Sequence, residues 1–175
     1  KAVGPIAYIV RARFVGLRDI GAALSPQSAF NIIQGLETVS LRMEKHCSNA
    51  AKVAEYLSSH NKVSKVIYAG LDEGEAGERA NKYLKGGHGA LCGIELKGGK
   101  ASGEKFINNL NMFYHVANIG DARSLAIHPA STTHSQLSDE EMESAGVTPS
   151  YVRLSIGIEH IDDIIEDLKN ALDAA

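Results

Sequence analysis

Apolar residues recur at spacings of three and four along two long stretches of the chain. The first stretch begins at Ser25-Pro26, a serine N-cap followed by proline at the first helical position, and its apolar stripe predicts helix as far as His60. Gly35 is the candidate position for a break within this helix. The second stretch, 161–172, has isoleucine and leucine along one face and acidic residues in its first turn, which predicts a C-terminal helix.

Short alternating runs bounded by glycine lie between these helices and predict strands. Because several links are short, the sheet is expected to mix parallel and antiparallel neighbours, mostly antiparallel, with helices covering one face. The predicted fold class is therefore α/β of the α+β kind, preceded by long helices. We expect a loop over 70–78, strands at 63–68, 91–96, 112–118, 124–128 and 151–157, and helices at 79–85, 101–110 and 137–146.

Composition removes several classes of function. The 175 residues are 44% hydrophobic and 22% charged, which is typical of a globular domain with a sizeable core. The net charge of −3 gives no electrostatic reason to expect nucleic acid or an anionic membrane as a partner. No apolar run approaches the ~20 residues that span a bilayer. Cys47 and Cys92 lie in unlike contexts, and we expect both to be buried free thiols of a cytoplasmic protein.

The polar segment 124–137 contains imidazole and hydroxyl groups that a metal site or a nucleophile would need. His128 and His134 are six positions apart, wider than ordinary zinc-ligand pairs, and His115 lies too far upstream to complete a set. Ser131 has no flanking nucleophile-elbow glycines. We therefore expect no metal site, and interpret the segment as a polar loop whose hydroxyls bond backbone groups.

A lone arginine stands within the last predicted strand. Arg153 lies between Val152 and Leu154 in "YVRLSIG". A guanidinium that points into a protein interior is costly unless it meets an anion, and its planar fork suits a carboxylate. Residue chemistry alone leaves two interpretations open: a clamp for the carboxylate of a ligand, or a structural pair with a protein Asp or Glu.

Three longer stretches resemble the Cys/Met-metabolism family of pyridoxal-phosphate (PLP) enzymes. The resemblance covers about 7–171 and implies the C-terminal small domain of the type I PLP-dependent transferase fold, which is similar to aspartate aminotransferase. These stretches are "GLETVSLRMEKHCSNAAKVAEYL", "NIGDARSLAIHPASTTHSQLSDEE" and "GVTPSYVRLSIGIEHIDDIIEDL".

Shorter motifs narrow the resemblance within that family. "LRDIGAALSP", "NIGDARS" and "THSQL" are most similar to O-acetylhomoserine sulfhydrylases. Cystathionine γ-synthases, cystathionine lyases and methionine γ-lyases tend to have Ser-Leu-Gly where this chain has Asn118-Ile119-Gly120.

The resemblance implies a substrate-binding role for three residues. In the family, the arginine of the "VRLS" strand holds the α-carboxylate of the amino-acid substrate, and this arginine corresponds to Arg153. Asn118 falls where the family has a Ser or Asn that hydrogen-bonds the same carboxylate. Thr133 falls at a threonine that lines the same pocket.

The same resemblance places the catalytic and cofactor-binding groups outside this chain. The family's Schiff-base lysine, in a Ser-x-Thr-Lys or similar stretch, has no counterpart, because Ser64-Lys65 begins a predicted strand. We expect residues 1–60 to be a helical segment leading in from a missing PLP-binding large domain, and residues 61–175 to be the C-terminal α/β domain. We expect no catalytic residue, PLP-binding residue or metal ligand in this chain.

The implied function is the carboxylate-binding part of a PLP enzyme that converts O-acetylhomoserine and sulfide to homocysteine and acetate. The fragment alone is expected to be inactive. The family implies an amino-acid substrate, the N-terminal PLP domain as partner, and a homo-oligomer that is tetrameric at full length. The alternatives are a member similar to cystathionine γ-synthase or methionine γ-lyase, and a split-gene assembly module without activity of its own.

Overall fold

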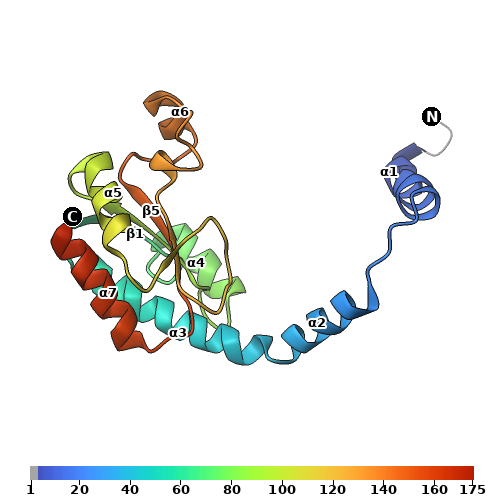
Figure 1. Cartoon of the computed structure of the whole chain (residues 1–175), viewed down its shortest axis with the longest axis horizontal. Coiled ribbons are helices and arrows are strands. Elements are labelled where there is room, and N and C mark those ends of the chain that lie inside the picture. Colours follow the sequence, from blue (N-terminus) through green and yellow to red (C-terminus); the bar gives the residue numbers. More distant parts are fainter. Residues whose placement is uncertain (1–3) are drawn as a thin grey trace. The chain divides into compact units, whose positions relative to one another are not determined.

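The computed structural model describes residues 4–175, apart from the side chain of Asp139. The chain forms two compact units, one ending at Val39 and one running from Ser40 to Ala175 (Figure 1). No helix in the described part of the chain is long and apolar enough to cross a membrane.

The first unit is helical, and its helices bury none of their described residues. Its elements are a 3-10 turn η1 (Gly4–Ile6), α1 (Ala7–Arg11), a π-helical segment η2 (Ala12–Asp19) and α2 (Pro26–Glu37). Helix α2 starts as predicted, because the side chain of Ser25 accepts a hydrogen bond from the N–H of Ser28. It ends at Glu37, so the break falls at Thr38 and the expectation of a break at Gly35 is wrong.

The second unit contains a five-stranded mixed sheet, as the sequence predicts. The strand order is β1-β2-β5-β4-β3. Within residues 4–175, β3 and β4 pair in parallel and the other neighbouring strands pair antiparallel. The third strand is much shorter than expected from 112–118. The strands are β1 (Val63–Ile67), β2 (Leu91–Leu96), β3 (Tyr114–His115), β4 (Leu125–Ile127) and β5 (Tyr151–Ser155).

Three helices supply the apolar face that covers this sheet. They are α3 (Val39–Ser58), α5 (Gly99–Asn109) and α7 (Ile161–Ala174), and α5 packs beside α7 (Figure 1). Helix α3 was expected in the leading segment 1–60, but its buried side chains belong to the core of the second unit. Alternate residues of the central strands face these helices, including Ile94 of β2 and Leu154 of β5.

Two shorter helices complete the unit. Helix α4 spans Gly74–Tyr83, so the predicted loop over 70–78 is wrong for its last five positions. Glu75 in the first turn of α4 interacts favourably with the helix dipole. The glycine-rich composition of this stretch conceals the start of the helix. Helix α6 (Asp139–Ser144) has the predicted capping box: Ser138 accepts from the N–H of Glu141, whose carboxylate accepts from the N–H of Ser138.

The two cysteines are both free, but they differ in burial. Cys92 is fully buried in β2, as predicted. Cys47 is only half-buried, so the expectation of a buried thiol is wrong there. The reason is that Cys47 lies on α3 beside the loop that follows α4, away from the sheet core.

Candidate functional site

The pleat of β5 decides where the predicted arginine lies. Val152 and Leu154 are fully buried against the helices, so Arg153 between them lies on the opposite face of the sheet and is half-buried. It pairs with Gly93 of β2 on one side and Ile127 of β4 on the other. The guanidinium therefore does not point into the helix-covered core.

Glycine at position 93 makes room beside this arginine. A Cβ at Gly93 would lie 2.6 Å from Cε2 of Tyr151, so the tyrosine ring occupies the space that a side chain would fill. Burial raises the pKa of the Tyr151 hydroxyl, and the positive charge of Arg153 acts in the opposite direction. Tyr151 is therefore a neutral, half-buried side chain next to the guanidinium.

The guanidinium of Arg153 contacts the loop that carries Asn118, which is distant in the sequence. Its Nη2 donates a hydrogen bond to the backbone oxygen of Asn118, at 3.2 Å. Among residues 4–175, excepting the Asp139 side chain, no carboxylate lies within ion-pair distance of this guanidinium. Of the two interpretations left open, the structural pair with a protein Asp or Glu thus finds no support in the described contacts.

Asn118 meets the arginine through its main chain. Its side-chain Oδ1 accepts the N–H of Ile119 at 2.9 Å, and the residue is exposed. Two residues later Gly120 has φ of 79°, a left-handed conformation that favours glycine, and its N–H donates to Oγ of Ser155 at 3.3 Å. The structure therefore brings Asn118 and Arg153 together, and the proposed contact of the Asn118 amide with a substrate stays a prediction.

Thr133 does not take part in the contact between Arg153 and Asn118. It is exposed after the 3-10 turn η3 (Pro129–Ser131), and its Oγ1 pairs with Nδ1 of His134 at 2.9 Å. No hydrogen bond within residues 4–175 joins it to Arg153. Its role in a substrate pocket stays a prediction.

The first part of the segment 124–137 is buried and contains β4, so the interpretation as a polar loop holds only from His128 onward, where hydroxyl groups bond the backbone. The ring of His128 is fully buried, and both nitrogens have protein partners: Oγ of Ser131 at 2.8 Å and the backbone oxygen of Pro149 at 2.8 Å. The hydroxyl of Thr132 donates to the backbone oxygen of His128. A histidine with both nitrogens engaged by protein groups has no free position for a metal ion.

Sequence reasoning missed the residues that hold the Asn118 loop. Ser155, Gly157 and Glu159 follow Arg153 at every second position and contact this loop. The period-two spacing in "RLSIGIE" is the signal that could have indicated them. Helix α3 supports the same segment from its other side, through His46 and Asn49.

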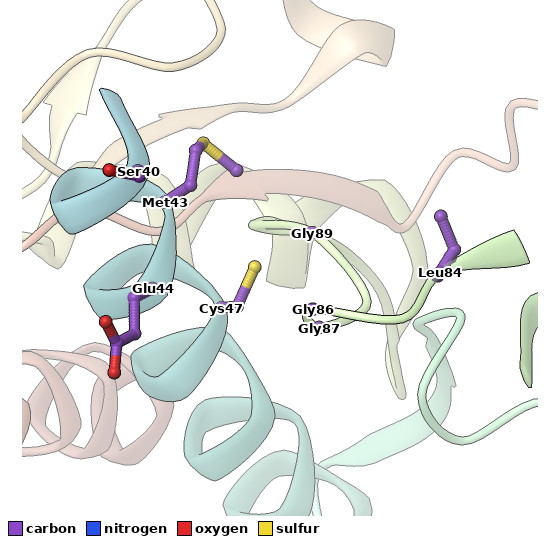
Figure 2. Close-up of a pocket in the computed structure, with 8 residues that line it drawn as sticks. All are labelled: Ser40, Met43, Glu44, Cys47, Leu84, Gly86, Gly87 and Gly89. Atoms are coloured by element: carbon purple, nitrogen blue, oxygen red, sulfur yellow. The ribbon is translucent and has the colours of Figure 1, made fainter. Parts of the chain in front are cut away.

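Two recesses lie near this region. One of about 600 Å³ lies between α3 and the loop carrying Gly86, Gly87 and Gly89, and Figure 2 shows the Cys47 sulfur directed from α3 toward that loop. None of the three predicted site residues lines it. A second, largely apolar recess of about 300 Å³ includes Ile119, next to Asn118.

The described lysines do not fit covalent attachment of a cofactor. All of them except Lys62 are exposed to solvent. The Nζ of Lys62 donates to three backbone oxygens at the C-terminal end of α7, which leaves it engaged as a helix cap. The expectation that no lysine of this chain holds PLP stays a prediction.

Comparison with known proteins identifies the family. The model of the Cys/Met metabolism PLP-dependent enzymes matches residues 7–173. An O-acetyl-L-homoserine sulfhydrylase of Leptospira meyeri is 55% identical over 95% of this chain and 38% of its own length. A homocysteine synthase of Schizosaccharomyces pombe is 48% identical over 100% of this chain and 41% of its own. An L-methionine γ-lyase of Fusobacterium nucleatum subsp. polymorphum is 46% identical over 92% and 41%.

A solved structure agrees with this assignment. The crystal structure of a Campylobacter jejuni protein assigned as an O-acetylhomoserine (thiol)-lyase superposes with a TM-score of 0.85 at 44% identity, over 97% of this chain and 40% of that one. It carries N'-pyridoxyl-lysine-5'-monophosphate at its position 205. The chain thus spans about two fifths of the length of the relatives that it matches. With 167 consecutive residues matched and this structural agreement, the chain belongs to the Cys/Met metabolism family of PLP-dependent enzymes.

Proposed function

We propose that this chain is the substrate-carboxylate-binding part of an enzyme that converts O-acetylhomoserine and sulfide to homocysteine and acetate. The observation that carries the proposal is Arg153: a half-buried guanidinium on the face of the sheet away from the helices, held by a backbone oxygen. The relatives named as O-acetyl-L-homoserine sulfhydrylases support the choice of reaction.

The contact with Asn118 explains how the arginine can serve as a clamp. A guanidinium has five N–H donors in a fixed plane, and the Asn118 oxygen accepts from one of its terminal nitrogens. That bond restricts rotation of the plane, while the other donors remain to meet a carboxylate in the two-pronged geometry that arginine favours. A fixed fork orients the substrate as well as neutralising its charge.

The cofactor is assigned to the part of the protein that the relatives have and this chain does not cover. When bound, PLP supplies the electron sink for loss of acetate and addition of sulfide. The residues of this chain bind and orient the substrate carboxylate. The isolated chain is therefore expected to be inactive and to form no stable adduct with added PLP, which an absorption spectrum after gel filtration would check.

Substitution of Arg153 tests the carboxylate clamp in the PLP-loaded full-length enzyme. Arg153→Ala is expected to raise KM for O-acetyl-L-homoserine by about 30-fold to several-thousand-fold, since loss of one partner of a desolvated charge pair costs about 2–5 kcal/mol. Arg153→Lys keeps the charge and loses the fork, so it is expected to lie between Ala and the parent. The absorption of bound PLP is expected to stay unchanged in both variants.

An exposed arginine provides the matched control. Arg79 on α4 pairs with Glu75 one turn away, and both side chains are exposed. Arg79→Ala is expected to leave KM at the parent value. A parent KM and kcat in a normally folded Arg153→Ala variant would refute the clamp.

A second reaction is favoured by a specific relative. The L-methionine γ-lyase of Fusobacterium nucleatum is 46% identical, so elimination from a γ-substituted amino acid is the competing proposal. The same full-length protein separates the two reactions. Homocysteine and acetate from O-acetylhomoserine and sulfide support the sulfhydrylase, whereas rapid release of methanethiol from methionine supports the lyase.

We also propose that the first unit is covered in the full-length oligomer. Large apolar side chains there are exposed, for example Tyr8 at 84%, Phe30 at 56% and Leu36 at 59%. Exposed patches of this kind mark surfaces that another part of a protein covers. A dye that fluoresces on apolar surfaces is expected to bind the 175-residue chain and not the full-length enzyme.

A further inference from the structure

The strand that carries Arg153 continues into a segment that grips the Asn118 loop at every second residue. Arg153 donates to the oxygen of Asn118, and Oγ of Ser155 accepts the N–H of Gly120. Farther along, the N–H of Gly157 donates to Oγ of Ser124 at 2.9 Å. Arg153 and Ser155 lie on the same side of β5 because side chains alternate across a strand, and Gly157 continues the row of contacts through its main-chain N–H.

Glu159 is the last residue of this row, and both oxygens of its carboxylate accept hydrogen bonds from Ser124. Its Oε1 accepts the backbone N–H of Ser124 at 2.6 Å, and its Oε2 accepts the hydroxyl of the same serine at 3.0 Å. The N–H of Ile158 adds a bond to the oxygen of Ala122 at 2.9 Å. Hydrogen bonds to a carboxylate are shorter and stronger than those between neutral groups. Ser124 is fully buried, and one side chain binds it at two atoms.

The main chain under Glu159 is held from the helix side. The amide of Asn49 donates to the oxygens of Gly157 and Glu159, at 3.0 and 2.9 Å. Nδ1 of His46 bonds the oxygen of Ile156 at 2.6 Å. Both side chains lie on α3 and are almost completely buried. The backbone that positions Glu159 is therefore part of the core, while the loop that it holds is exposed from Asn118 to Arg123.

We propose that Glu159 is a positioning residue for the carboxylate clamp, acting through Ser124 and the Asn118 loop on the guanidinium of Arg153. This inference rests on the proposed function of Arg153. The loop from Asn118 to Ser124 has no regular secondary structure, so its position depends on these bonds. Without the Glu159 carboxylate, Ser124 loses two of its bonds and keeps those to the N–H groups of Tyr114 and Gly157, so the loop shifts and the Asn118 oxygen fixes the plane of the guanidinium less firmly.

Kinetics of the PLP-loaded full-length enzyme with O-acetyl-L-homoserine test the role of Glu159. Glu159→Ala is expected to raise KM on the order of tenfold with kcat within about twofold of the parent, because a misplaced binding group weakens productive binding. Glu159→Gln retains one acceptor for the N–H of Ser124 and is expected to recover most of the parent KM. Asp163→Ala removes an exposed carboxylate from the first turn of α7 and is the control with parent KM.

A double-mutant cycle separates action through Arg153 from an independent effect. If Glu159 acts through the arginine, the variant with both Arg153→Ala and Glu159→Ala has the KM of Arg153→Ala alone. Additive increases in KM overturn the inference. An unchanged KM in Glu159→Ala beside a raised KM in Arg153→Ala also overturns it, and leaves the proposed function standing.

Two further outcomes complete the test. A parent KM in Arg153→Ala refutes the proposed function itself, and the positioning role falls with it. Should Glu159→Ala not fold, Ser124→Ala takes its place: it removes the hydroxyl that links Glu159 to Gly157 and keeps the backbone bond. Its expected KM increase is about threefold and is absent on the Arg153→Ala background, and equal increases on both backgrounds overturn the inference.

Discussion

A buried aspartate of the last helix anchors the turn between α5 and β3. Asp167 is 7% exposed, and its carboxylate accepts three consecutive backbone N–H groups. Oδ1 accepts from Asn111 at 2.9 Å, and Oδ2 accepts from Met112 at 2.9 Å and from Phe113 at 3.4 Å. Because these donors follow the C-terminal end of α5, the bonds join α5, α7 and the edge of the sheet.

The geometry sets the magnitude expected for Asp167→Asn. An asparagine has one acceptor oxygen, so in its better orientation it keeps the bonds to Met112 and Phe113 and turns its NH₂ toward the N–H of Asn111. One hydrogen bond to a charged group is lost, which costs about 1.5–3 kcal/mol of unfolding free energy. Asp167→Ala removes all three acceptors and is expected to cost about 3–5 kcal/mol.

Urea denaturation of the 175-residue chain at constant pH measures these free energies, provided that the slopes of the transitions agree between variants. Asp163→Asn on the exposed side of the same helix is the matched control, with an expected change within about 0.5 kcal/mol. The expected order of stability is parent, Asp167→Asn, Asp167→Ala. Equal stability of parent and Asp167→Asn would refute the assignment of Asp167 as an anchor for three backbone donors.

Two further predictions concern close packing and burial. Gly157→Ala is expected to lower the free energy of unfolding by at least about 2 kcal/mol, because the added Cβ would lie 2.5 Å from the nitrogen of Ser124 and 2.6 Å from the oxygen of Ala122. Gly16→Ala is the control, since its added Cβ meets no atom within 4 Å. Thermal melts in which both variants match the parent would contradict this prediction. Burial raises the pKa of the Cys92 thiol to about 12, so iodoacetamide at pH 9 is expected to alkylate Cys47 in the native chain and Cys92 only after denaturation, with mass spectrometry of the labelled peptides as the measurement.

Local sequence patterns determined the elements whose bonds close within a few residues. The N-cap at Ser25, the capping box of Ser138 and Glu141, and the stripe of α7 each depend on neighbours in the sequence, and the structure has all three. The alternation around Arg153 likewise determined that its two neighbours are buried, because the side-chain period of a strand is two.

Tertiary structure decided what Arg153 touches. Asn118 lies 35 positions away, and the arginine contacts its main-chain oxygen, which every residue type possesses. Glu159 and Ser124 are also 35 positions apart, and no sequence motif around either residue predicts its contact with the other. The start of α4 inside a glycine-rich stretch was equally hidden. Such contacts form only when loop closure and sheet register bring distant backbone together; the period-two spacing after Arg153 indicates which residues share its side of the strand, but it does not indicate which distant loop they contact.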